Sequence, residues 1–152
     1  MLTQCLILRL NMTQDNHSQA IAWLTNFHKL LDARNADLAI PALFTEDSTL
    51  RFGDNPPCTG HAELLSFFNT QFALLESMKH IIKHVDVLPD RIYQEAEIHY
   101  VIKNDPEKKE VVVRGMAVLG KRPDEDRLRF FDVYIDSSQI KERIEAAMTP
   151  HE

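Results

Sequence analysis

After Ser77 the chain alternates apolar and polar residues with a period of two, the spacing of strands that bury one face. Four long extended runs follow one another. The short links between them, "LPDR", "NDPEKK" and "RPDED", combine proline with aspartate, which is a turn signal. Links of this length can join antiparallel strands but not parallel ones. The sequence therefore predicts a four-stranded antiparallel meander, and any fold proposed for the chain must accommodate it.

The run from Arg91 to Lys103 shows most clearly which face of the meander is buried. The apolar residues Ile92, Ala96, Ile98, Tyr100 and Ile102 share one parity of this run. Tyr93, Glu95, Glu97 and His99 share the other. We therefore expect one face of the sheet to be buried and the other to meet solvent or a partner.

Helical periodicity dominates the first half of the chain. Helices are predicted at 18–35, 37–44, 61–77 and, near the C-terminus, 139–148. Ser18 and Asp37 are the expected N-caps of the first two helices. Residues 48–52 are expected to form a short strand, and 53–60 a loop rich in glycine and proline.

A single domain accounts for this pattern, because 152 residues are enough for one hydrophobic core. We place the domain at 18–140, between an N-terminal extension at 1–17 and a short C-terminal helix and tail at 141–152. Two start sites are compatible with the N-terminal sequence. Met12 opens the polar segment that leads to the first helix, and if it is the true start, residues 1–11 lie upstream of the protein.

Charge and cysteine content exclude several classes of function. The formal net charge is -6 and no cluster of Lys and Arg offsets it, so binding to nucleic acid is not expected. No apolar run approaches the roughly 20 residues of a membrane span, so no membrane association is expected. Cys5 and Cys58 show neither a disulfide framework nor a zinc-binding pattern, which suits a reducing cytoplasm.

The segment "MKHIIKHVDVLP" contains two histidines four residues apart, His80 and His84, and a carboxylate at Asp86. On a helix the two histidines could share a metal ion, whereas on a strand at about 3.3 Å per residue they are roughly 13 Å apart. The β-branched residues of the segment favour the strand, so no metal site is expected. A strand keeps His80, His84 and Asp86 on one side, and His84 is expected to be partly exposed.

The order of these elements resembles that of the nuclear transport factor 2-like superfamily, in particular its SnoaL-like branch. The motifs that carry the resemblance are "LFTEDSTLRFGDNPPCTGHAELLSFF", "KHII" at the first long strand and "FFDVYIDSSQI" at the last. The resemblance covers roughly residues 18 to 140. It implies an α+β fold in which a curved antiparallel sheet wraps around N-terminal helices to form a cone with an internal pocket. It also implies a homodimer through the outer face of the sheet.

The fold alone does not define an activity, because it hosts isomerases, dehydratases, cyclases, epoxide hydrolases and binding modules. Where members similar to limonene epoxide hydrolase carry polar and acidic side chains, this chain has Leu50, Phe52, Ile98, Tyr100 and Val133. The carboxylates that would transfer protons to and from water are therefore missing, and epoxide hydrolysis by that constellation is not expected.

A second family pattern is retained. Members similar to dehydratases pair an Asp near the end of the first helix with a His at the start of the first long strand, and Asp32 and His80 match these positions. The resemblance implies that Asp32 orients the imidazole and that His80 is the catalytic base, since a neutral imidazole is a competent base near pH 7. Tyr100 is either a donor to a developing oxyanion or a core residue. The alternative for Asp32 is a solvated position at the helix end.

Taken as implied by the resemblance, the pocket is lined by Trp23, Phe27, Phe52, Phe68, Ile98, Met116, Phe131 and Val133. His28 is a further candidate on the first helix, and Trp23 can instead cover the rim of the sheet. The predicted partner is a small, apolar organic ligand. As an enzyme, the protein would be an isomerase, cyclase or dehydratase that abstracts a proton and needs no cofactor and no metal. The alternative is a non-catalytic ligand-binding or dimerisation module.

Overall fold

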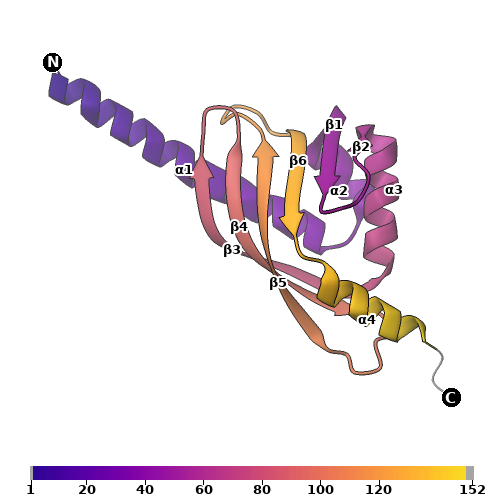
Figure 1. The fold of residues 1–152 in the computed structure, drawn as a ribbon. Coiled ribbons are helices and arrows are strands. Elements are labelled where there is room, and N and C mark those ends of the chain that lie inside the picture. Colours follow the sequence, from indigo (N-terminus) through magenta and orange to yellow (C-terminus); the bar gives the residue numbers. More distant parts are fainter. Residues whose placement is uncertain (1, 150–152) are drawn as a thin grey trace.

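The predicted meander is present in the computed structural model, which describes residues 2–149. Its strands are β3 (Leu75–Val87), β4 (Ile92–Ile102), β5 (Glu110–Gly120) and β6 (Leu128–Ile135), and consecutive strands pair antiparallel. Two further strands are β1 (Phe44–Phe52), parallel to β6, and the short β2 (Cys58–Thr59), antiparallel to β1. The sheet order is β2-β1-β6-β5-β4-β3 (Figure 1).

The helices of the described range are α1 (Leu2–Asp32), α2 (Ala36–Leu43), α3 (Gly60–Ala73) and α4 (Ser138–Met148). The C-terminal half of α1 crosses one face of the sheet, and its N-terminal half extends past the sheet edge (Figure 1). α1 contacts β3, α3 contacts β1, and α4 contacts β4. The predicted α+β class is confirmed. Met1 and the tail at 150–152 lie outside the described residues, and no helix between them is long and apolar enough to cross a membrane.

The first helix begins at Leu2 and not at Ser18, so the predicted N-cap at Ser18 is wrong. The polar residues before Ser18 are largely exposed and continue the helix, with Gln19 Nε2 donating to the Asp15 carboxylate one turn earlier at 3.0 Å. Buried apolar residues recur at helical spacing from Ala20 to Leu31, where the helix meets the sheet. The polar stretch therefore has the composition of a loop although it is helical.

Two other helix ends also differ from the prediction. The N-cap of α2 is Asn35, whose Oδ1 accepts a backbone N–H of the first turn at 3.3 Å, and Asp37 lies inside that turn. α3 ends at Ala73, before the predicted Ser77, and Leu75 is the first residue of β3. Leu75 is buried in the strand, which explains why it also fitted the apolar period of the helix.

Strand β4 alternates as predicted. The buried parity includes Ile92, Ala96, Ile98, Tyr100 and Ile102, and the residues between them are partly exposed. Gln94 shares the buried parity and is only 3% exposed, although it is polar. The residues of this parity define the inner face of the sheet, to which β4 therefore contributes apolar side chains and the single amide of Gln94.

Strand β3 does not keep one parity along its length. Its pairing with β4 shifts between Ile82 and His84, so that His84 lies opposite Glu95, which is on the outer face. An extra residue at such a bulge moves every following side chain to the other face. His80, before the shift, stays on the inner side. The prediction that His80 and His84 share one side of the strand is therefore wrong.

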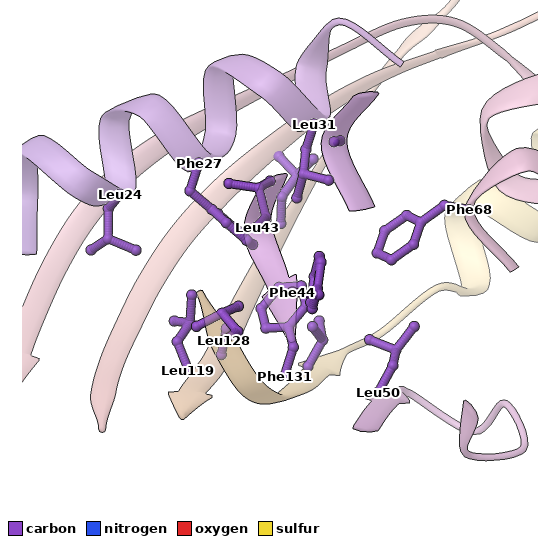
Figure 2. Close-up of a cluster of buried hydrophobic side chains, with 14 of the residues drawn as sticks. Leu24, Phe27, Leu31, Leu43, Phe44, Leu50, Phe68, Leu119, Leu128 and Phe131 are labelled. Atoms are coloured by element: carbon purple, nitrogen blue, oxygen red, sulfur yellow. The ribbon is translucent and has the colours of Figure 1, made fainter. Parts of the chain in front are cut away.

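The hydrophobic core lies between α1 and the sheet (Figure 2). Phe27 of α1 is fully buried, and its ring centroid lies 5.3 Å from that of Phe131 on β6 and 6.2 Å from that of Phe44 on β1. Leu24 and Leu31 point into the same cluster from the turns on either side (Figure 2). Their burial fixes α1 against the sheet and so determines where its C-terminal end lies.

A buried ion pair anchors α4. Arg143 donates from Nε to Asp105 Oδ2 at 3.0 Å and from Nη2 to Oδ1 at 2.6 Å. The Asp105 side chain is fully buried in the link between β4 and β5 and also accepts two backbone N–H groups of that link. The bonded guanidinium, helped by these N–H groups, holds the pKa of Asp105 below its usual value. The anchored helix places Ile140 and Ile144 against the cavity described below.

Candidate active site

An apolar cavity of about 240 Å³ lies between the inner face of the sheet and helices α1, α3 and α4. Its predicted lining residues are Phe52, Phe68, His80, Ile98, Tyr100, Phe131 and Val133, and Phe67 and Phe72 add two further rings. The other polar or charged side chains that reach it are His28, Asn55, Gln71, Gln94, Ser137 and Lys141. Apolar walls with few polar groups are typical of sites for small organic molecules.

Asp32, at the end of α1, and His80 of β3 are in direct contact. His80 Nδ1 lies 2.6 Å from Asp32 Oδ1, and the backbone N–H of His80 donates to Asp32 Oδ2 at 3.0 Å. Both side chains are mostly buried, with 20% of Asp32 and 14% of His80 exposed. The two oxygens of one carboxylate therefore hold both the main chain and the ring of the same histidine.

This contact determines the tautomer of His80. An ionised carboxylate only accepts hydrogen bonds, so Nδ1 carries the proton and donates it to Asp32. In the neutral ring, Nε2 then has a free lone pair. Because His80 lines the cavity and Asp32 does not, the carboxylate lies behind the ring. A lone pair that faces a ligand site, with a carboxylate behind it, is the arrangement of a general base.

A second histidine, His28 of α1, stacks on His80 with ring centroids 4.3 Å apart and planes inclined by 20°. His28 is 5% exposed, and its Nε2 lies 2.8 Å from Oε1 of Gln94 on β4. Its Nδ1 is buried without a hydrogen-bond partner among the described residues. Burial, and after it repulsion by His80, lowers the pKa of His28 to about 4. The His28 ring is therefore neutral at pH 7.

Tyr100 lies on the inner face beside this group and is 6% exposed. It pairs with Met78 in the register of β3 and β4, whereas His80 pairs with Ile98. Tyr100 and His80 are therefore diagonal neighbours, roughly 7–8 Å apart. Burial raises the pKa of Tyr100 well above its usual value, and the negative charge of Asp32 raises it further. The phenol stays protonated at neutral pH and can donate a hydrogen bond.

Trp23 and Phe27, predicted to line the pocket, lie away from it. They stack on each other at 5.1 Å; Trp23 Nε1 donates to the carbonyl of Asp126, and Phe27 is a core residue. They share a helix face with Leu31, but the cavity reaches only the last turns of α1. Met116 borders the cavity, yet it belongs to the outward row of β5 and is 42% exposed.

Sequence reasoning missed Gln94 and the polar residues Asn55, Gln71, Ser137 and Lys141. Gln94 could have been recognised from the sequence, because it is a polar residue in an otherwise apolar parity of β4. The other residues come from helices and loops that approach one another only in the fold, and no local pattern marks them.

The second histidine of the pair in β3 takes no part in this site. The side chain of His84 is 66% exposed, and its Nε2 lies 3.2 Å from Asp86. Within residues 2–149, no group of three His, Cys, Asp or Glu residues is close enough to hold a metal ion. Cys58 is a free cysteine, and the side chain of Cys5 lies outside the described part of the chain.

Acid is expected to destabilise the fold through His28. Its pKa is about 4 in the folded state against an ordinary 6.5, so the unfolded chain binds the proton more tightly. The stabilisation is fully present above pH 6.5 and is lost as the pH falls towards 4, by about 3 kcal/mol in all. Urea unfolding of wild type and His28→Phe from pH 7 to pH 4 measures this contribution. Equal losses of stability in the two proteins would show that His28 contributes nothing to acid sensitivity.

Comparison with known proteins supports the fold described above. A family model described as a SnoaL-like domain matches residues 24–128. None of the curated proteins matches the sequence. The fold, in contrast, is similar to many solved structures.

A Catenulispora acidiphila hypothetical protein with a ketosteroid isomerase-like fold, in complex with trimethylamine, has 20% identity and a TM-score of 0.69; 84% of this chain and 97% of that chain are covered. A putative SnoaL-like polyketide cyclase from a Jannaschia species has 13% identity and a TM-score of 0.69. The match covers 88% of this chain and 94% of that one. The epoxide hydrolase/cyclase-like enzyme SalBIII has 14% identity and a TM-score of 0.66. The match covers 81% of this chain and 94% of that one. At these identities the likeness defines the fold and not an activity.

The meander packed against helices, with an apolar cavity between them, places the protein in the class with the nuclear transport factor 2-like fold. Within that class, the chain belongs to the SnoaL-like domain family, because the family model matches most of its length.

Proposed function

We propose that the protein binds a small, mainly apolar carbonyl compound and moves a proton on it, as an isomerase, cyclase or dehydratase does. The observation that carries this proposal is the contact of 2.6 Å between Asp32 and His80 at the wall of the apolar cavity. A base that is oriented by a carboxylate and enclosed by apolar walls is suited to removing a proton from carbon.

Each group has a distinct part in the proposed reaction. His80 Nε2 takes a proton from the carbon next to the carbonyl group, and the imidazolium that forms is stabilised by Asp32 through Nδ1–H. Tyr100 donates a hydrogen bond to the carbonyl oxygen, where negative charge develops. The diagonal spacing of His80 and Tyr100 suits a small carbonyl compound bound between them. His80 then returns the proton to the same molecule, so no cofactor is required.

Two of the compared structures support a small-molecule site. The Catenulispora protein is described in complex with trimethylamine, and the Jannaschia protein as a putative polyketide cyclase. These descriptions concern those proteins, and they favour the same kind of site here. The apolar residues Leu50, Ile98 and Val133, at positions that are polar or acidic in epoxide hydrolase-like members, favour proton transfer on carbon over attack by water.

The proposal is tested with 1-indanone, an apolar ketone with exchangeable protons next to its carbonyl group. Wild-type protein in deuterium oxide is expected to accelerate deuterium incorporation at that carbon, measured by proton NMR. His80→Gln should still bind the ketone, as judged from chemical-shift changes, but should lose the acceleration. His84→Gln is the matched control and should behave as wild type, since His84 faces solvent.

The binding-only alternative makes the opposite prediction, because it expects 1-indanone to bind without any acceleration of exchange. The homodimer also stays a prediction. It is supported by the exposed apolar side chains of Val112, Met116 and Tyr134 on the outer face, where a second copy would cover them.

A further inference from the structure

The stacked pair of His28 and His80 is built from three elements. α1 supplies His28, β3 supplies His80, and β4 supplies Gln94, whose Oε1 accepts a hydrogen bond from Nε2–H of His28. Gln94 is 97% buried, on a parity whose neighbours are apolar. Burial of a polar amide is costly unless the amide is hydrogen-bonded. The proton transfer proposed above requires neither His28 nor Gln94.

We propose that His28, held by Gln94, is a positioning residue for His80: a neutral ring that fixes the plane of the base and leaves its proton affinity undiminished. This inference rests on the proposed function, since it assigns a role through the base. His80 is fixed at its Nδ1 edge by Asp32 and on one face by His28, and neither contact involves the Nε2 edge, which stays available to a ligand.

The neutral state of His28 is the essential part of the inference. His80 gains a positive charge when it takes a proton, and a second imidazolium stacked at 4.3 Å in a buried site would oppose that charge. Gln94 offers His28 an uncharged acceptor, which satisfies Nε2–H without favouring the charged ring. Burial acts in the same direction and lowers the pKa of His28.

Other titratable groups near the two histidines do not cancel the repulsion that a charged His28 would exert on a charged His80. Asp32 of α1 favours positive charge on both rings, but it is bonded to His80 and not to His28. Tyr100 of β4 is protonated and uncharged. Lys141 of α4 also lines the cavity, and its positive charge would disfavour a second cation. The choice between Gln and an acidic residue at position 94 therefore decides the charge of His28.

The test is the variant Gln94→Glu, which keeps the size of the side chain and makes the acceptor of His28 anionic. The readout is the rate at which diethyl pyrocarbonate modifies His80, followed by peptide mass spectrometry from pH 5 to pH 8. A glutamate that acted directly on His80 would raise its proton affinity. A glutamate that acts by charging His28 lowers it, so the two effects have opposite signs.

We expect the midpoint of the pH dependence for His80 to fall by about one pH unit or more in Gln94→Glu, a tenfold loss of proton affinity. The double variant His28→Phe/Gln94→Glu should remove this fall, because it has a flat ring that cannot be charged. An unchanged or raised midpoint in Gln94→Glu would overturn the inference. If His80 is not modified in the wild-type protein, the base assignment itself fails, and with it the proposed function.

A second pair of variants tests the orienting role and serves if Gln94→Glu does not fold. In His28→Phe the stack persists, and His80 should keep the wild-type tautomer in nitrogen-15 NMR spectra. In His28→Ala the face of the ring is free, so the ring can turn away from Asp32 and lose the bond from Nδ1–H that fixes its tautomer. The spectra should then show a mixture of tautomers. Identical wild-type spectra for both variants would show that Asp32 alone fixes the ring and would overturn the inference.

Discussion

Asp32→Asn is expected to slow proton abstraction in the cavity by about 10²- to 10⁴-fold, the range that a positioned acid–base group contributes. The carboxylate accepts Nδ1–H of His80 at 2.6 Å and leaves Nε2 as the base. An amide can instead donate to Nδ1, which shifts the proton to Nε2 and removes the lone pair from the cavity. Deuterium incorporation into 1-indanone, measured for wild type and variant, gives the ratio of the two rates of proton abstraction.

Asp86→Asn is the matched control for this prediction. Asp86 is also a carboxylate near a histidine, but it lies beside His84 in an exposed part of β3. Its variant should exchange the ketone at the wild-type rate. If Asp32→Asn also retained the wild-type rate while His80→Gln lost it, Asp32 would have a structural role only.

Phe27→Ala is expected to cost about 3–5 kcal/mol of stability, the range for removal of a fully buried aromatic ring. The ring has no exposed surface and contacts the ring of Trp23. It also contacts the rings of Phe44 and Phe131 (Figure 2). Its loss leaves a cavity between α1 and the sheet. The free energy of unfolding, measured with urea for wild type and variant, gives the cost.

Leu38→Ala provides the comparison, because Leu38 is a large apolar residue of α2 that is 66% exposed. Its replacement should change stability by no more than about 0.5 kcal/mol. A loss below about 1 kcal/mol for Phe27→Ala would contradict the central place given to Phe27 in the core.

The sheet could be predicted from the sequence because its signals are local. The alternation of Ala96, Ile98 and Tyr100 with the polar residues Glu95, Glu97 and His99 gives both the strand and its buried face. The Pro/Asp links give the antiparallel order. Helix ends were predicted less well. Polar residues before Ser18 are compatible with a loop and with an exposed helix, and only packing distinguishes the two.

The face of a residue after a bulge could not be predicted. One extra residue between Ile82 and His84 reverses the parity of β3, and it is visible only in the pairing with β4. Trp23 and Phe27 illustrate a similar limit. Helical spacing shows that they face inward, but it does not show how far along α1 the cavity reaches.

The residues of the candidate site are distant in sequence, which limits what any local pattern can reveal. Asp32 and His80 were expected to meet because of a family resemblance, and the structure brings their side chains together; their role stays a proposal. The stack of His28 on His80, and the amide of Gln94 behind it, depend on the exact placement of α1 against β3 and β4. No spacing in the sequence encodes that placement.

The central claim is that Asp32 holds His80 with the Nε2 lone pair open to the cavity. The nitrogen-15 NMR spectrum of the His80 ring in the wild-type protein tests it most directly, since the two ring nitrogens give distinct shifts when only one is protonated. For the neutral ring, we predict a protonated Nδ1 and an unprotonated Nε2. A ring with the proton on Nε2 and none on Nδ1 would contradict it.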